Sequence, residues 1–198
     1  MTVRQRPPLF VARPFRAVEL GSEDAAELQR FFDENPEYFV SVTGQRPHRA
    51  EAQDEIDRLP PEDFTFTRKW AIGFVDESES MVAMADVVSD LMAKDVWHIG
   101  LFIVATRLHG AGIAEILYGA LERWAREHGA RWLRLGVVDG NTRAERFWQG
   151  RGFVEVRTRD GVQMGARTHT IRVMAKPLAG GGHAEYLALV ARDRPGAP

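Results

Sequence analysis

The chain has 198 residues, a net charge of −2 and no cysteine, and 44% of its residues are hydrophobic and 27% charged. These values suit a soluble globular protein with its own core. They exclude disulfides, thiolate metal sites, a cysteine nucleophile and a bulk attraction to nucleic acid or to an anionic membrane. The N-terminus shows no apolar stretch typical of a signal peptide, and no apolar run is long enough to span a bilayer. We therefore expect a cytoplasmic protein with neither a nucleic-acid nor a membrane partner.

The first half of the chain predicts a strand, two helices and a pair of strands. Residues 15–20 alternate between apolar and polar, which is typical of a strand. Gly21 and Ser22 end this strand and cap a helix with an apolar side, which in turn ends at Asn35 before a proline. The other elements predicted here are an acid-rich helix at 48–58 and strands at 70–75 and 81–88.

The second half predicts alternating strands and helices. They are a strand at 96–104, a helix at 113–128 with Gly129 as its C-cap, a strand at 132–138, a helix at 144–150, and strands at 153–158 and 168–174. The pattern indicates a mixed α/β sheet with several consecutive antiparallel strands. We predict a single domain over residues 1–178 and a flexible tail over 179–198, with a short helix within 183–191.

A glycine turn follows the strand at 96–104. It carries Arg107, Gly110 and Gly112, and an amphipathic helix begins at Ile113. Such a turn aims unpaired backbone N–H groups at one point, and the helix dipole adds positive character there. The glycines permit a sharp turn and the close approach of a ligand. The turn therefore predicts a site for a phosphate or pyrophosphate, although a turn that needs glycine for geometry alone is the simpler alternative.

A dinucleotide-binding turn is a second interpretation of this segment. Its third glycine position would be Glu115, and five residues separate Val104 from Gly110, whereas that turn follows its strand directly. Both features count against a nicotinamide-dinucleotide protein. Asp139, near the end of the next strand, keeps this alternative open.

A second motif follows the strand at 132–138. Together with the glycine turn it resembles the GCN5-related N-acetyltransferase (GNAT) superfamily, which carries R/Q-x-x-G-x-G/A after its fourth strand and N-x-x-A-x-x-F/L-Y-x-x-x-G-F after its fifth. Arg107, Gly110 and Gly112 match the first motif at every fixed position. The matches to the second are Asn141, Ala144, Phe147, Gly152 and Phe153. The resemblance covers roughly residues 70–175 and implies the GNAT acyl-CoA N-acyltransferase fold, with splayed fourth and fifth strands.

The resemblance implies that acetyl-CoA is the co-substrate and that no metal is needed. It places the pyrophosphate on the amides of residues 109–114 and the pantetheine arm along the backbone of residues 102–104. Asn141 would fix that arm, Phe147 and Trp148 would wall the thioester, and the Val104 N–H would polarise its carbonyl. The implied cofactor-binding residues are thus Phe102, Ile103, Val104, Arg107, His109, Gly110, Ala111, Gly112, Ile113, Ala114, Asn141, Phe147 and Trp148.

Two positions depart from the family pattern. Trp148 stands where most members have a Tyr that can protonate the leaving thiolate, and an indole N–H donates hydrogen bonds but is no acid at neutral pH. His109 stands where many members have Arg before the first glycine. The family pattern therefore identifies no general acid in this chain, and the phosphate site lacks one fixed positive charge.

His98 is the candidate general base. It precedes Gly110 by 12 residues, and in histone-type members of the family a Glu base occupies that spacing. If His98 is the base, kcat/KM should rise around the imidazole pKa of about 6.5. The structural alternative is a strand histidine packed beside Trp97. Asp86 and Asp90 are weaker candidates.

An acidic stretch lies between residues 51 and 63. It holds six acids against one base, and in this family the first two helices border the acceptor site, so an acidic rim would attract a cationic amine. A solvated helix face is the simpler interpretation. Tyr38 and Phe39 are candidates to line the acceptor pocket or to belong to the core.

We therefore predict an acetyl-CoA-dependent N-acetyltransferase that transfers to a primary amine, on a small molecule, by direct attack in a ternary complex. The alternative from another class is a non-catalytic module that binds or senses acyl-CoA, which the Trp at 148 favours. Homodimers are frequent in the family, and an edge strand or residues 186–190 would supply the interface.

Overall fold

The computed structural model describes residues 6–197, and its centre is one eight-stranded sheet. The strands are β1 (Phe10–Ala12), β2 (Phe15–Glu19), β3 (Arg68–Val75), β4 (Met81–Ser89), β5 (Val96–Val104), β6 (Trp132–Val138), β7 (Val154–Met164) and β8 (Arg167–Pro177). They lie in the order β1-β2-β3-β4-β5-β6-β8-β7. Every neighbouring pair is antiparallel except β5 and β6, which are parallel.

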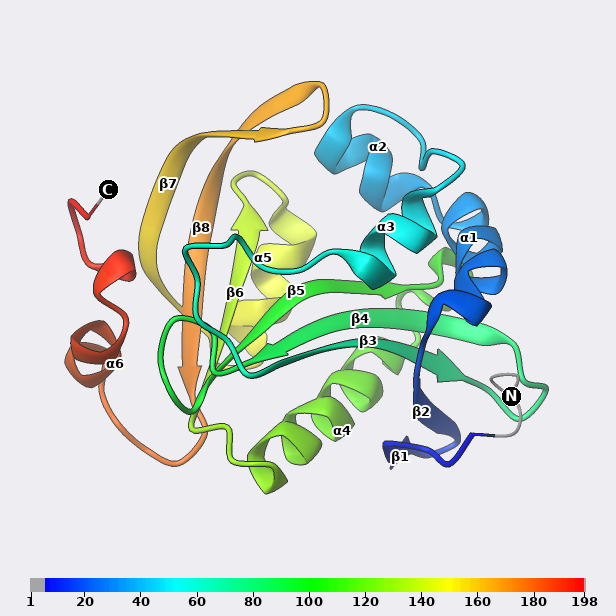
Figure 1. Ribbon diagram of the computed structural model, residues 1–198, viewed down its shortest axis with the longest axis horizontal. Coiled ribbons are helices and arrows are strands. Elements are labelled where there is room, and N and C mark those ends of the chain that lie inside the picture. Colours follow the sequence, from blue (N-terminus) through cyan, green and yellow to red (C-terminus); the bar gives the residue numbers. More distant parts are fainter. Residues whose placement is uncertain (1–5, 198) are drawn as a thin grey trace.

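The described part of the chain also contains helices, most of which pack on the two faces of this sheet (Figure 1). They are α1 (Ala25–Glu34), α2 (Glu37–Thr43), α3 (Glu51–Asp57), α4 (Ile113–Glu127), α5 (Thr142–Gly150) and α6 (His183–Leu189). Side chains of α4 and α5 share one core cluster with the sheet, and side chains of α1, α2 and α3 share another on the opposite face. None of the helices within residues 6–197 is long and apolar enough to cross a membrane.

Helix α4 shows how the sequence builds this core. Leu117, Leu121, Trp124 and Ala125 recur at helical spacing and are all buried. Trp124 packs edge-on against Trp97 of β5, with ring centroids 5.4 Å apart. The burial of these aromatic side chains fixes α4 against β5, and thereby fixes the turn that joins them.

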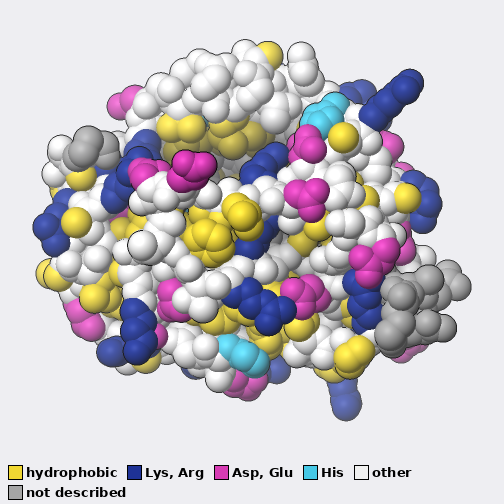
Figure 2. Space-filling view, viewed as in Figure 1, with side chains coloured by type: hydrophobic (Ala, Val, Ile, Leu, Met, Phe, Trp, Pro, Cys, Tyr) yellow, Lys and Arg dark blue, Asp and Glu magenta, His cyan; other side chains and the backbone are white. Residues whose placement is uncertain are grey.

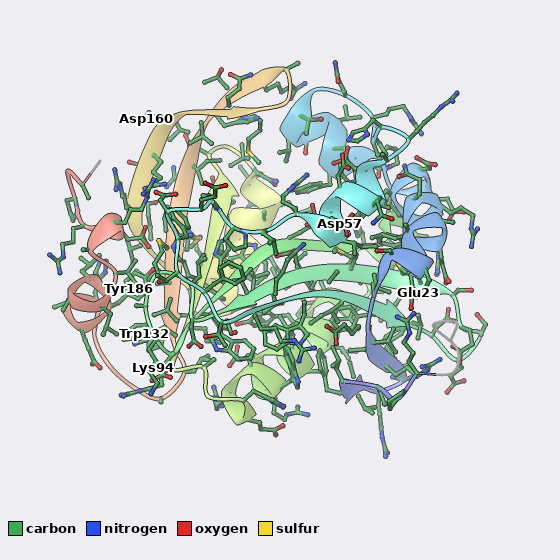
Figure 3. The ribbon with its side chains drawn as sticks, viewed as in Figure 1. Glu23, Asp57, Lys94, Trp132, Asp160 and Tyr186 are labelled. Carbon is green, nitrogen blue, oxygen red and sulfur yellow. The ribbon has the colours of Figure 1, made fainter. Side chains whose placement is uncertain are left out.

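The C-terminal segment packs against the sheet. Tyr186 of α6 packs on Trp132 of β6 with ring centroids 5.3 Å apart and is fully buried. Both residues are labelled in Figure 3. Asp193 is also fully buried and forms a salt bridge with Arg134 of β6 at 2.8 Å. The sequence predicts a flexible tail over 179–198. Residues 183–193 of it form α6 and a short 3-10 helix, and the ion pair and the aromatic contact join them to the sheet.

The predicted strands at 96–104 and 132–138 match β5 and β6 at both ends. Three features differ from the prediction. Strand β1 and helix α2 were not predicted, and the hairpin of β7 and β8 extends to Met164 and Arg167. The extension reaches across the molecule to α2, where the Ala166 N–H donates to the Thr43 carbonyl at 3.0 Å.

Candidate functional site

The site is a cleft that opens where β5 and β6 separate. The two strands pair only from Val96 with Trp132 to Ile99 with Leu135, although each continues beyond that point. Their unpaired ends line a cleft of about 1610 Å³, together with parts of α2, the glycine turn, α5 and the β7–β8 hairpin. Figure 2 shows this face hollowed beneath the hairpin, with hydrophobic and basic side chains exposed in the hollow.

The backbone of β5 faces this cleft with hydrogen-bonding groups that no strand uses. The Ala105 N–H donates to Val82 of β4 at 2.8 Å. Because amides alternate in direction along a strand, the Phe102 and Val104 N–H groups point away from β4 and into the cleft. A bulge at Gly100 opposite Asp86 precedes them, and a Cβ at Gly100 would lie 3.0 Å from the Asp86 Oδ1.

The glycine turn lies at one end of the cleft. Gly110 and Gly112 have φ of +80° and +75°, in the left-handed region that favours glycine, and a Cβ on either would meet no atom within 4 Å. Gly112 is the N-cap of the 15-residue helix α4. Within residues 6–197, the Gly110 and Gly112 N–H groups have no acceptor, and the first N–H groups of α4 have none within the helix. The turn therefore offers a concave set of donors at a positive helix end.

His109 links this turn to helix α5. Its Nε2 lies 2.8 Å from the Val104 carbonyl oxygen, and its Nδ1 lies 2.7 Å from Nη1 of Arg143. A guanidinium only donates, so Nδ1 accepts and Nε2 carries the proton that is donated to Val104. The contact holds the positive charge of Arg143 beside the turn, at the position where the sequence indicates a missing charge.

Helix α5 forms the wall of the cleft opposite β5. The Asn141 Oδ1 caps this helix by accepting from the Ala144 N–H at 3.2 Å, which leaves its amide NH₂ without an acceptor among the described residues. Phe147 stacks on Phe102 with centroids 6.2 Å apart, and Trp148 meets the same ring edge-on at 5.7 Å. All of these residues line the cleft.

The comparisons with known proteins agree with this geometry. The sequence matches the acetyltransferase (GNAT) family over residues 28–153. The chain belongs to the GNAT acetyltransferase family. No curated protein matches it.

Solved structures of GNAT acetyltransferases share the fold. An acetyltransferase from Thermus thermophilus is 23% identical with a TM-score of 0.66, covering 83% of this chain and 97% of that one. A GCN5-related N-acetyltransferase from Kribbella flavida is 20% identical with a TM-score of 0.61 (85% and 100% covered). A spermidine N-acetyltransferase from Vibrio cholerae, solved with CoA and spermine, is 14% identical with a TM-score of 0.64 (87% and 98%).

Most of the predicted cofactor-binding residues of this GNAT domain lie together. Those that line the cleft are Phe102, Ile103, Val104, His109, Gly110, Gly112, Ile113, Ala114, Asn141, Phe147 and Trp148. Arg107 and Ala111 are exposed and are not among the lining residues. The structure adds Arg143, which the sequence does not single out; its place in the first turn of the helix that Asn141 caps is the available signal.

Neither Trp148 nor the tyrosine behind it replaces the tyrosine that is usual at position 148. Trp148 is buried and packs edge-on against Tyr118, with centroids 5.3 Å apart. Tyr118 is buried behind it, does not line the cleft, and has its pKa raised by burial and by Glu122. Neither ring can therefore protonate a thiolate in this cleft at neutral pH.

His98 lines the cleft but is held as a neutral ring. Its Nδ1 lies 3.3 Å from Nη1 of Arg134, which donates to it. Burial, followed by the charge of Arg134, lowers the pKa of His98 to about 3. A ring with this pKa gives no titration near 6.5, so the geometry favours the structural alternative for His98 over the role of general base.

The acidic stretch at 51–63 does not border the cleft. None of its six acids is among the lining residues of the described chain. Glu55 is buried and bonds Arg58 at 3.0 Å, while Asp63 bonds Arg192 at 2.8 Å. Burial, followed by the charge of Asp86, raises the pKa of Glu55. Tyr38 does line the cleft, whereas Phe39 belongs to the core.

Proposed function

We propose that this GNAT domain transfers the acetyl group of acetyl-CoA to a primary amine of a small molecule, by direct attack within a ternary complex. The observation that carries the proposal is the separation of β5 from β6 beyond Ile99 and Leu135, which exposes strand-edge donors next to the glycine turn. A pantetheine arm is an extended chain of amides, and it suits an unpaired strand edge. The spermidine N-acetyltransferase that shares the fold acts on a small amine, which supports this class of acceptor.

The residues divide the work of binding. The amides at Gly110 and Gly112 and the first turn of α4 would hold the pyrophosphate, and Arg143 would add a charge beside them. The Asn141 NH₂ would bond the arm, and Phe147 and Trp148 would exclude water from the thioester.

The chemistry needs little from side chains. Acetyl-CoA supplies an activated carbonyl, and the Val104 N–H, which points into the cleft, would stabilise the negative charge that develops on its oxygen. The amine nitrogen forms the new bond to the carbonyl carbon as the C–S bond breaks. The amine releases one proton to water and the thiolate takes one from water, because no side chain at His98 or Trp148 is suited to either transfer.

Calorimetric titration with acetyl-CoA, with NAD as control, tests the cofactor. We expect saturable binding of acetyl-CoA alone. Preference for NAD would overturn the assignment of the glycine turn. Thiol release with a panel of primary amines then tests catalysis.

A non-catalytic acyl-CoA-binding module is the second candidate. The absence of a tyrosine at Trp148, with Tyr118 buried behind it, favours this alternative. Binding of acetyl-CoA without thiol release to any amine would support it. The homodimer and the cytoplasmic location stay predictions; Tyr186 and Val190 are buried against their own chain, which takes them out of an intermolecular contact.

A further inference from the structure

The far end of the cleft lies between α2, the hairpin of β7 and β8, and the paired part of β5 and β6. Its floor holds His98 and Arg134, and its apolar walls come mainly from the hairpin. The wall residues are Val162, Met164, Ile171 and Val173. This end is therefore separate from the glycine turn and lies where an acceptor can reach the strand edge.

The hairpin is fixed in place over this end of the cleft. The Ala166 N–H donates to Thr43, Nη1 of Arg167 donates to the Ser41 carbonyl at 2.9 Å, and Nε2 of His169 lies 2.7 Å from the Val42 carbonyl oxygen. All three contacts join the hairpin to α2. A side chain that this hairpin directs into the cleft is consequently held in position while these contacts are made.

Arg159 of β7 is such a side chain, and it has no protein partner. Among the described residues it makes no hydrogen bond and no ion pair, although it lines the cleft. Its neighbours on the hairpin are all bonded: Arg157 donates to the carbonyls of Arg192 and Ala197, and Arg172 bonds Asp139 and Glu155. The guanidinium of Arg159 thus differs from every other arginine of β7 and β8.

The charge around Arg159 is positive. Arg134 is neutralised by Asp193, which accepts at 2.8 and 3.0 Å and also accepts from the Tyr186 hydroxyl at 2.6 Å. Burial, followed by the charges of Arg157, Arg192 and Arg134, lowers the pKa of Arg159, so those charges act together against it. No carboxylate among the lining residues lies on the hairpin or on the floor of this end. Arg167 of the hairpin also lines the cleft and donates only to a carbonyl oxygen, so this end of the cleft carries a net positive charge.

We propose that the acceptor is an amine that also carries a carboxylate, with an apolar body, and that Arg159 binds this carboxylate. A planar guanidinium pairs with a carboxylate through two parallel hydrogen bonds. Arg159, which has no protein partner, can form both of these bonds without losing a contact within the protein. The apolar walls fit the body of the molecule, and its amine is left for the strand edge. The inference rests on the proposed function and names the substrate class of the same site.

The experiment compares methionine and phenylalanine with their amides as acceptors, by thiol release. The amide keeps the body of each molecule and removes the negative charge. Because it also lowers the pKa of the amine, the preference is judged by its change between the native protein and the variants at one pH. We expect kcat/KM at least about 10-fold higher for the acids, chiefly through KM. The Arg159→Met variant should lose this preference and keep its kcat/KM for the amides. Arg159→Lys should restore part of it, because a charge returns without the planar fork.

Arg157→Met is the matched control, since it removes an arginine two residues away whose partners are backbone carbonyls. It should keep the preference for the acids. Calorimetry with acetyl-CoA on every variant separates the two proposals. If the native protein binds no acetyl-CoA, the proposed function fails. If it binds acetyl-CoA and acetylates acids and amides equally, or if Arg159→Met lowers both equally, only the carboxylate site is overturned.

Discussion

The two ends of the cleft are built by different means. At the glycine turn the binding groups are backbone amides, placed by a tight turn, a helix N-terminus and a strand edge. At the acceptor end they are side chains from α2, β5, β6 and the β7–β8 hairpin, which are far apart in sequence. Backbone groups can serve a ligand that is common to a fold, and side chains can change from one member to the next without changing the fold. The cofactor end is thus a property of the fold, and the acceptor end is a property of this chain.

The largest expected effect concerns the buried salt bridge beneath the acceptor end of the cleft. Asp193→Ala leaves the buried Arg134 without its counter-ion, so the free energy of unfolding should fall by about 3–5 kcal/mol. Urea unfolding measures it. The control is Arg192→Ala, which breaks the exposed pair with Asp63 and should cost about 1 kcal/mol or less. At urea concentrations below its unfolding transition, the Asp193→Ala variant should bind acetyl-CoA with native affinity. Weakened binding would contradict the separation of the two ends of the cleft.

Gly112→Asp should act only on the cofactor end. It places a carboxylate in the open space in front of the turn, so the Kd for acetyl-CoA should rise by at least about 100-fold, or about 2.7 kcal/mol. Calorimetry on the folded variant measures it. Gly180→Asp is the matched control, because Gly180 also has a φ of +80° with no atom near its Cβ position and does not line the cleft. Native affinity in Gly112→Asp would remove the phosphate site from this turn.

His98 tests the floor of the acceptor end through its pH dependence. Its pKa falls from about 6.5 in the unfolded chain to about 3 in the folded one, so its contribution to stability is complete above pH 6.5 and is lost progressively as the pH falls towards 3. Between pH 7.5 and 5.0 the native protein should lose about 1–2 kcal/mol relative to His98→Gln in urea unfolding. A parallel pH dependence of the two proteins would mean that the ring titrates normally, and would restore His98 as a candidate base.

The smallest expected effect is that of Arg143. Arg143→Met removes the charge that His109 holds beside the turn, and the Kd for acetyl-CoA should rise about 5-fold at low salt and less at high salt. Titrations at two ionic strengths measure it. Arg126→Met, on the exposed side of α4, controls for net charge. An unchanged Kd at low salt would mean that Arg143 contributes nothing and that the backbone of the turn alone forms the phosphate site.

The sequence predicts the local structure around the glycine turn well because local rules determine it. A strand, two glycines and an amphipathic helix adjoin one another between residues 96 and 128, and the strand bounds and the N-cap of α4 follow from them. The acceptor end depends on contacts between distant segments. Pro36 signalled the end of α1 but not that α2 begins directly after it, and the polar pattern of β7 hid the length of its hairpin. The pairing of Arg134 with Asp193, which leaves Arg159 alone, has no local signal at all.

The bonds between the hairpin and α2 also bear on the order of folding. His169 and Val42 are 127 positions apart in the chain, so their contact closes one of the longest loops in the molecule. Such a contact forms after the sheet between its partners has assembled, because its loop-closure entropy is offset only then. It rests on hydrogen bonds at exposed or half-buried positions, so we expect it to be the first contact to open in the native state. Hydrogen exchange at Ala166 would then report the opening of the acceptor end on its own, while the β5 amides that are bonded to β4 stay protected.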